Sequence, residues 1–220
     1  MGKLANLLDF VKKTWAEKYR PKTLDEIVGH EEIVRELKGY VASCNCPHLI
    51  FHGPPGTGKT SAAIAFARDF LGEAFEYCFI ELNASDDRGI DTIRTLIRNF
   101  CRTRPLFGSL KIVMLDEADF MTADAQAALR RTMEKYSIAR FILTANDLDP
   151  IMDAIRSRCT VYEFEKLAEF EIVEKLREIA RAEGLAIEDW VLYSIAKESD
   201  GDLRRAINRL QGIAGSCRVD

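Results

Sequence analysis

The sequence lacks any apolar run long enough to cross a membrane as a helix. Its longest runs, such as residues 111–115, have the length of a β-strand, whereas a membrane helix needs about 20 residues. Cysteine is scarce, with six scattered residues, and Cys44 and Cys46 are separated by one residue where zinc-binding pairs usually have two or more. Internal repeats and low-complexity tracts are absent as well. We therefore expect a globular protein with reduced, structural thiols.

An uninterrupted apolar centre, as found in a signal peptide, is also missing from the N-terminal residues. Leucine and valine alternate there with lysine and asparagine, which is typical of a short amphipathic helix. Residues 1–14 are expected to form an N-terminal extension of this kind, in a protein that is not secreted and does not enter a membrane.

Acidic residues outnumber basic residues, so the net charge is −4. A nucleic-acid partner would have to be met by a local basic patch. One such patch exists between residues 88 and 104, where Asp91 is the only acid among five arginines. These arginines are Arg88, Arg94, Arg98, Arg102 and Arg104. Three of them recur every four residues, a spacing that also fits an ordinary solvated helix face.

The motif that carries most chemistry is a phosphate-binding loop, Gly-Pro-Pro-Gly-Thr-Gly-Lys-Thr at residues 53–60. Its glycines let backbone N–H groups curl around phosphate oxygens, Lys59 supplies a charge to the β- and γ-phosphates, and the Thr60 hydroxyl can ligate Mg²⁺. The residues expected to hold the nucleotide are Gly53, Pro54, Pro55, Gly56, Thr57, Gly58, Lys59, Thr60 and Ser61. The loop does not decide which class of NTPase this is.

A second apolar strand, residues 111–115, is followed by two acids, Asp116 and Glu117. At the carboxyl end of a parallel strand they would lie beside the phosphate loop, so Asp116 is expected to hold the Mg²⁺ shell and Glu117 to polarise the attacking water. Asn146 ends a further apolar strand and could orient that water, although it also fits an ordinary turn. Residues 116–119 spell the letters of DEAD-box helicases, but such a helicase needs a second strand-rich domain.

The order of the elements predicts an α/β fold. Strand patterns occur at residues 49–52, 77–82, 111–115, 140–145 and 160–164, and helix patterns at 31–43, 60–71, 91–102, 123–136 and 150–156. This alternation indicates a three-layer parallel sheet. Three helices, at 169–183, 189–198 and 202–214, follow without further strands. We expect a P-loop ATPase domain at residues 15–166 and a small all-helical lid domain at 167–220, with the nucleotide in the cleft between them.

These motifs resemble those of AAA+ ATPases of the sliding-clamp-loader type, most closely the small subunits of replication factor C of archaea and eukaryotes. The matching segments are residues 15–24, 53–60, 81–86, 116–131, 156–159 and 201–208. They span nearly all of residues 15–214, and the Ser-Arg-Cys element at 157–159 is far more specific than the phosphate loop. The resemblance implies an Mg²⁺-dependent ATPase that uses ATP binding and hydrolysis to place a sliding clamp on primer–template DNA. Its expected location is the cytoplasm of an archaeon or the nucleus of a eukaryote.

The resemblance also implies partners and roles for single residues. The partners are the clamp, the replication factor C large subunit, other small subunits and primer–template DNA. Arg158 is expected to be an arginine finger that reaches the γ-phosphate on a neighbouring subunit, Asn83 to restrain Glu117 until DNA arrives, and Arg204 to sense the phosphate from the lid. Adenine, favoured over guanine, is expected to lie near Tyr19, Arg20, Pro21, Ile27 and Val28. DNA phosphates are expected near Arg88 and Arg94.

Some features depart from that family. A third, helical collar domain is usual there, but this sequence stops at Asp220, so either the chain is truncated or its assembly is weaker. The residues around Asn146 and the long leading helix also differ from the usual pattern. Two alternatives remain open. One is a branch-migration helicase, although no DNA-translocating hairpin is evident between residues 83 and 111, and the other is a scaffold subunit that does not hydrolyse ATP, against which Lys59 and Glu117 argue.

Overall fold

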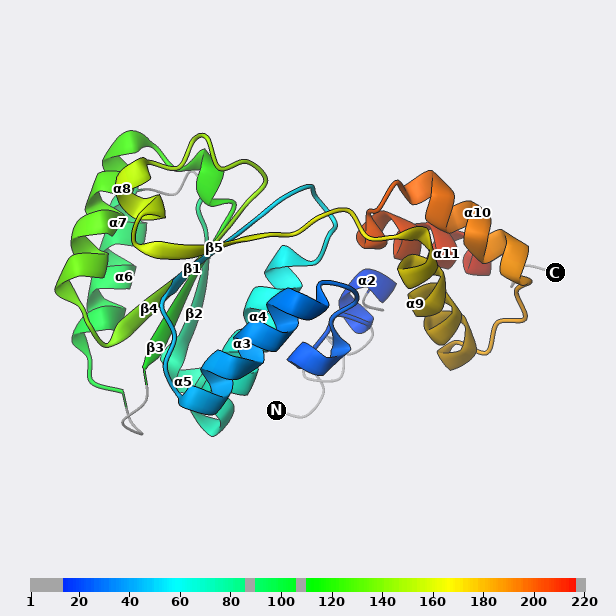
Figure 1. Cartoon of the computed structure of the whole chain (residues 1–220), viewed down its shortest axis with the longest axis horizontal. Helices are drawn as coiled ribbons and strands as arrows, with labels where there is room; N and C mark the ends of the chain where they lie inside the picture. Colours follow the sequence, from blue (N-terminus) through cyan, green and yellow to red (C-terminus); the bar gives the residue numbers. More distant parts are fainter. Residues whose placement is uncertain (1–13, 86–89, 106–109, 217–220) are drawn as a thin grey trace, which may run out of the picture. The chain divides into compact units, whose positions relative to one another are not determined.

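In a computed structural model, residues 14–85, 90–105 and 110–216 are described, without the side chains of 90–94 and 216. The chain divides into two compact units, a sheet unit of Pro21–Lys166 and a helical unit formed by the residues up to Arg20 together with those from Leu167 onward. Figure 1 shows the elements of each unit along the chain. The expected α/β fold with a small helical domain is confirmed.

The sheet unit is built on five parallel strands in the order β2-β3-β4-β1-β5. Their bounds are β1 His48–His52, β2 Phe79–Asn83, β3 Lys111–Asp116, β4 Ala139–Ala145 and β5 Cys159–Glu163. Because side chains alternate along a strand, each apolar strand contributes to two cores. Leu49 and Phe51 pack on one side of the sheet, and Ile50 packs on the other.

Helices cover both faces of the sheet, as Figure 1 shows. Helices α3 (Glu31–Ser43) and α4 (Lys59–Leu71) pack over one core, and α6 (Ile90–Arg102) and α7 (Ala123–Lys135) over the other. Helix α3 has the bounds that its sequence pattern predicts. The alanine-rich α4 buries eight of its 13 residues, its four alanines among them, since small side chains let its backbone approach the strands closely.

Two predicted elements were wrong in part. Residues 77 and 78 belong to α5 (Phe75–Cys78) and not to a strand, because the chain continues from α4 through the short 3-10 helix Gly72–Ala74 and buries Cys78. Helix α8 is limited to Asp153–Arg156. The residues before it are held out of the helix by Gln126, whose amide donates to the Pro150 carbonyl and accepts from the Met152 N–H.

The helical unit contains α9 (Glu169–Ala182), α10 (Asp189–Ser199) and α11 (Leu203–Ser216). The turn of helix α2 (Trp15–Lys18) packs on it as well, so residues 14–20 group with the helical unit. The reason is that Trp15 is buried and its backbone N–H donates to the Gln211 side chain, while the Glu183 carboxylate accepts from both Lys18 and Tyr19.

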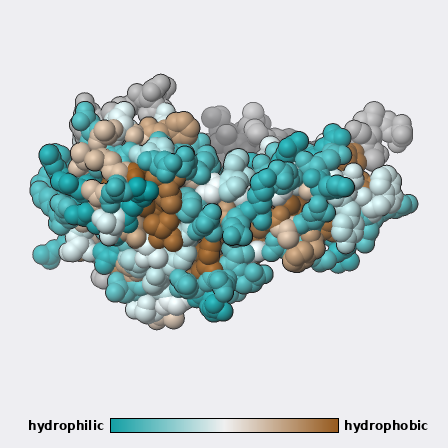
Figure 2. All heavy atoms as spheres, turned by 45° about the horizontal axis from the view of Figure 1, so that its top comes forward, coloured by the Kyte–Doolittle hydropathy of each residue, from teal (hydrophilic) through white to brown (hydrophobic). Residues whose placement is uncertain are grey.

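The visible surface in Figure 2 is mainly hydrophilic, and hydrophobic side chains show in limited areas. Within the described ranges, none of the helices is both long and apolar enough to span a membrane. The described cysteines are free thiols. Burial raises the pKa of Cys46 and Cys101 to about 11 and that of Cys159 to about 12, so these three thiols stay protonated at neutral pH.

Candidate functional site

The phosphate-binding loop connects β1 to α4 and depends on glycine backbone conformations. Gly53, Gly56 and Gly58 all have positive φ, a region that other residues adopt rarely. Gly53 is also closely packed, because a Cβ atom there would lie 2.1 Å from the carbonyl oxygen of Phe164. The chain after β5 passes against the loop at this point, and the Phe164 N–H donates to the His52 carbonyl at 2.7 Å. Glycine is therefore the residue that lets β5 and the loop meet.

Lys59, the first residue of α4, is buried and held by three oxygens. Its Nζ donates to the carbonyls of Gly53 and Pro54 at 2.6 and 2.7 Å and to Asn146 Oδ1 at 3.1 Å. Two residues that the sequence predicts for one site, Lys59 and Asn146, thus meet. Because β1 and β4 are neighbours, the loop that follows β1 and the residue that ends β4 lie at the same edge of the sheet. The contact places a cation at the end of the phosphate loop.

Asp116 and Thr60, the two predicted metal ligands, also lie together. The Thr60 hydroxyl donates to Asp116 Oδ1 at 3.0 Å. A carboxylate and a hydroxyl side by side are hard oxygen donors of the kind Mg²⁺ takes from proteins, which supply one or two ligands while water and phosphate supply the rest. The donor set therefore fits Mg²⁺. Among the described residues there is no cluster of three or more histidines, cysteines and acids that would suit another metal.

Thr144 on β4 is a site residue that the sequence analysis missed. Its hydroxyl donates to Asp116 Oδ1 and accepts the Glu117 N–H at 3.3 Å, so it joins the two acids at the end of β3. The signal was a single hydroxyl within the apolar residues 141–145. A buried polar side chain of this kind needs a partner, and Thr144 is 2% exposed.

Glu117 lies in a left-handed backbone conformation with φ of 55°. A residue with a Cβ atom seldom adopts this conformation, and such strained positions cluster at functional sites. The turn brings the chain from β3 into the short 3-10 helix Ala118–Phe120. Asp119 in this helix accepts the Asn146 N–H at 3.1 Å, which fixes the backbone of the proposed water-orienting residue.

Asn83 ends β2 and pairs in register with Asp116. Its amide oxygen accepts the N–H and the hydroxyl of Ser85 at 2.9 and 2.8 Å, so in this structure Asn83 holds a turn. Its place next to the residue that precedes Glu117 agrees with a role near that acid, but the restraint of Glu117 by Asn83 stays a prediction.

His30 is a second residue that the sequence analysis missed. Its Nε2 lies 3.2 Å from the Thr57 carbonyl in the phosphate loop, and its ring lies 4.6 Å from that of Phe164, centroid to centroid. Its φ of 58° turns the chain into α3. This histidine therefore supports the loop from the side, and no sequence motif marked it.

The remaining predicted nucleotide contacts are divided between the units. Pro21, Ile27 and Val28 belong to the sheet unit, and Ile27 packs against its core. In the helical unit, the Tyr19 hydroxyl lies 2.9 Å from Glu183, Arg20 forms an ion pair with Glu17, and Arg204 is exposed on α11. Burial and the Glu183 carboxylate raise the pKa of Tyr19. Arg88 and the side chain of Arg94 lie outside the described residues.

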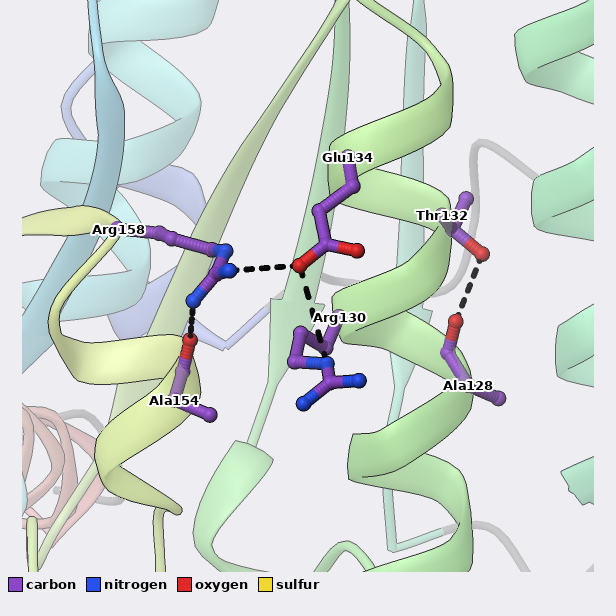
Figure 3. A network of polar contacts seen from close by, with 6 residues as sticks. All are labelled: Ala128, Arg130, Thr132, Glu134, Ala154 and Arg158. Carbon is purple, nitrogen blue, oxygen red and sulfur yellow. Dashed lines mark hydrogen bonds and ion pairs between the residues drawn. The ribbon is translucent and has the colours of Figure 1, made fainter.

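Arg158 lies at the opposite end of the sheet from the phosphate loop. It precedes Cys159, which pairs with His48 at the start of β1, whereas the loop follows His52 at the end of β1. With a rise of about 3.3 Å per residue, five residues along these strands separate the two ends by roughly 16 Å. Arg158 donates to the Ala154 carbonyl at 2.5 Å and to Glu134 Oε1 at 2.6 Å, as Figure 3 shows. The structure therefore does not bring Arg158 to the loop of its own chain.

A basic groove of about 790 Å³ lies between α6 and α7. Two cations from each helix line it, together with one acid, Asp124. The cations are Arg98, Arg102, Arg131 and Lys135. In the described part of the chain none of these four forms an ion pair. The groove thus carries net positive charge in an acidic protein, and it extends the arginine patch seen in the sequence to a second helix.

Comparison with known proteins gives consistent results. The family described as "ATPase family associated with various cellular activities (AAA)" matches residues 49–167, and the "RCF1/5-like, AAA+ ATPase lid domain" matches residues 174–214. Among curated proteins, the chain is similar to the replication factor C small subunit of Archaeoglobus fulgidus, with 54% identity over 91% of this chain and 63% of that one. It is also similar to that of Thermofilum pendens, with 52% identity over 94% and 64%.

A third relative, the replication factor C small subunit of Methanococcus vannielii, is 48% identical over 96% of this chain and 68% of its own. The first two relatives are longer than this chain, which spans 63% and 64% of their lengths. Among solved structures, the Thermotoga maritima RuvB Holliday junction branch migration motor matches with a TM-score of 0.75 and 21% identity, covering 90% of this chain and 65% of that one. At this identity the likeness shows the fold alone.

Proposed function

This chain belongs to the AAA family of ATPases and, within it, to the replication factor C small subunits, and from this membership we propose that it is the ATPase part of a sliding-clamp loader. In this role it binds and hydrolyses ATP to place a clamp on primer–template DNA. The observation that carries the proposal is the convergence of Lys59, Thr60, Asp116 and Asn146 at the carboxyl edge of β1, β3 and β4. Its partners are then the clamp, a large subunit and other small subunits.

Each of the residues at this edge has its own role in phosphoryl transfer. Lys59 places its charge on the β- and γ-phosphates, and Thr60 and Asp116 hold Mg²⁺, which when bound neutralises charge on the phosphate oxygens. Glu117 accepts the proton of the attacking water and Asn146 orients that water, with its backbone fixed by Asp119. Adenine contacts by Tyr19, Arg20, Pro21, Ile27 and Val28, and phosphate sensing by Arg204, are proposed on the family resemblance alone.

Arg158 acts on the nucleotide of a neighbouring subunit. Its distance of roughly 16 Å along the sheet from its own phosphate loop supports this assignment, because an arginine side chain cannot bridge that gap. A guanidinium is permanently charged and planar, so it can stabilise the charge that builds up on a γ-phosphate in the transition state. Hydrolysis by a lone subunit is then slow, and assembly accelerates it.

DNA is bound through its phosphates. Arg88 and Arg94 remain the proposed contacts, and the basic groove between α6 and α7 supports extending them to Arg98 and Lys135 on its two walls. Such contacts do not depend on sequence and weaken with salt. The likeness to RuvB concerns the fold, so it does not favour branch migration, and Lys59 and Glu117 favour hydrolysis over a purely scaffolding role.

ATP hydrolysis in the presence of primer–template DNA and a sliding clamp tests this proposal. We expect DNA and clamp to raise turnover, and Glu117→Gln and Arg158→Ala each to abolish the increase while ATP binding persists. Glu76→Gln, a substitution at an exposed glutamate on α5, is the matched control and should behave as the parent. Turnover that is unchanged by DNA and clamp, or that survives Glu117→Gln, would contradict the proposal.

A further inference from the structure

Glu134 occupies a position that local helix chemistry disfavours. It lies in the last turn of α7, where the helix dipole places partial negative charge and a carboxylate is unfavourable. It also follows Arg130 by four residues, and an acid that is C-terminal to its basic partner is the weaker of the two orders. Where local preferences are violated in a folded chain, a tertiary contact or a function usually explains the residue. For Glu134 that contact is Arg158.

One oxygen of Glu134 is shared by two arginines, as Figure 3 shows. Oε1 accepts from Arg158 Nη2 at 2.6 Å and lies 3.8 Å from Arg130 Nε. The second distance is too long for a hydrogen bond, and Arg130 Nε is a buried donor that has no hydrogen-bond partner among the described residues. Arg130 thus attracts the same carboxylate oxygen without donating a hydrogen bond to it.

We propose that Glu134 is a positioning residue that aims Arg158 at a nucleotide bound by a neighbouring subunit, with the Ala154 carbonyl as its second support. This inference rests on the proposed function, in which Arg158 acts between subunits. The two supports come from different helices, α7 and α8, and together they hold both terminal nitrogens of the guanidinium. Donors on Nε and on each terminal nitrogen remain available to a phosphate.

The arrangement of Arg158, Glu134 and Arg130 also keeps a net positive charge at the finger. A carboxylate alone next to the finger would repel an incoming phosphate and weaken the guanidinium, but Arg130 offsets it, so the three residues together present one net positive charge. Holding a long side chain in place beforehand removes an ordering cost that each productive encounter would otherwise meet. Such a cost corresponds to about two- to ten-fold in rate for one flexible side chain.

Mixing two variants of the chain isolates the effect of Glu134 on the action of Arg158 at a neighbouring subunit. Glu117→Gln binds ATP without hydrolysing it and keeps its finger, whereas Arg158→Ala keeps its catalytic residues and lacks a finger. Turnover in the mixture therefore requires the finger of the first variant at the site of the second. We expect Glu134→Ala in the Glu117→Gln subunit to lower the kcat of the mixture about two- to ten-fold with an unchanged KM for ATP. The same substitution in the Arg158→Ala subunit should have no effect.

Two further variants separate aiming from folding. Glu134→Gln in the finger-donating subunit should restore most of the turnover, because an amide oxygen still accepts from Nη2. Asp153→Asn removes the partner of Arg156, another exposed arginine–carboxylate pair on α8, and should leave the mixture unchanged. Equal losses whichever subunit carries Glu134→Ala, or no loss in either, would overturn the inference. A mixture that hydrolyses no faster than its components would instead overturn the role of Arg158 between subunits.

A measurement on the single chain does not depend on assembly. When a guanidinium is held at both terminal nitrogens, rotation about the Nε–Cζ bond is slow and the ¹⁵N resonances of these two nitrogens stay separate. In a free guanidinium the rotation is fast and the two resonances average to one. We expect Arg158 to show slow rotation in the parent chain and averaging in Glu134→Ala. Identical rotation in both chains would show that Glu134 does not hold the finger, and the inference would fail.

Discussion

Replacing Gly53 by alanine should destabilise the sheet unit far more than its single added methyl group suggests. The residue has φ of 135°, where a Cβ atom is strained, and the new atom would lie 2.1 Å from the Phe164 carbonyl oxygen. The strained backbone costs about 1–3 kcal/mol, and relieving the overlap by moving the loop or β5 costs about 1–3 kcal/mol more. We therefore expect a loss of about 2–6 kcal/mol, or roughly 5–20 °C in Tm.

The matched control is the same substitution at Gly39. This glycine lies in the middle of α3, nothing lies within 4 Å of the position that an added methyl group would take, and its φ is in the ordinary range. Alanine there should stabilise the protein by about 0.5–1 kcal/mol, because it reduces the freedom of the unfolded chain. One chemical change should thus have opposite signs at two positions.

Urea unfolding followed by far-UV circular dichroism and by tryptophan fluorescence measures both effects. Trp15 and Trp190 both belong to the helical unit, so fluorescence reports that unit while circular dichroism reports both. A Gly53→Ala chain whose stability lies within about 1 kcal/mol of Gly39→Ala would refute the close-packing argument. A loss of stability detected only by fluorescence would place the destabilisation in the helical unit, and it would refute the close-packing argument as well.

Three further predictions concern the sheet unit. Thr144→Val removes a hydrogen bond that orients Asp116, so the Mg²⁺ concentration for half-maximal ATP hydrolysis should rise about ten-fold or more, and an unchanged titration would contradict this. Burial lowers the pKa of His48 to about 4, below its ordinary value of 6.5, so the unfolded state binds more protons between these values. Stability to urea should therefore fall as pH drops from about 6.5 to about 4, and His48→Gln should flatten this dependence. Arg98→Gln and Lys135→Gln should each reduce the slope of log K for DNA against log salt by about one, and unchanged slopes would exclude the basic groove as the contact.

Most of the architecture could be predicted because it is encoded over short distances in the chain. Apolar runs of strand length indicated all five strands, and helix periodicity placed α3 at its observed bounds. The errors occurred where tertiary contacts override local preference. Gln126 holds Pro150 and Met152 out of the predicted helix, and residues 77 and 78 continue a helical path with Cys78 buried beneath it.

The sequence by itself determined the phosphate loop, the two acids after β3 and the order of strands and helices, because each depends on residues close together in the chain. Only the tertiary structure decided which side chains meet. Thr144 reaches Asp116 because β3 and β4 are neighbours, Gly53 must be glycine because β5 passes against it, and Glu134 meets Arg158 because α7 ends beside α8. Such contacts depend on strand order and register, which bring together residues far apart in sequence and which local patterns do not encode.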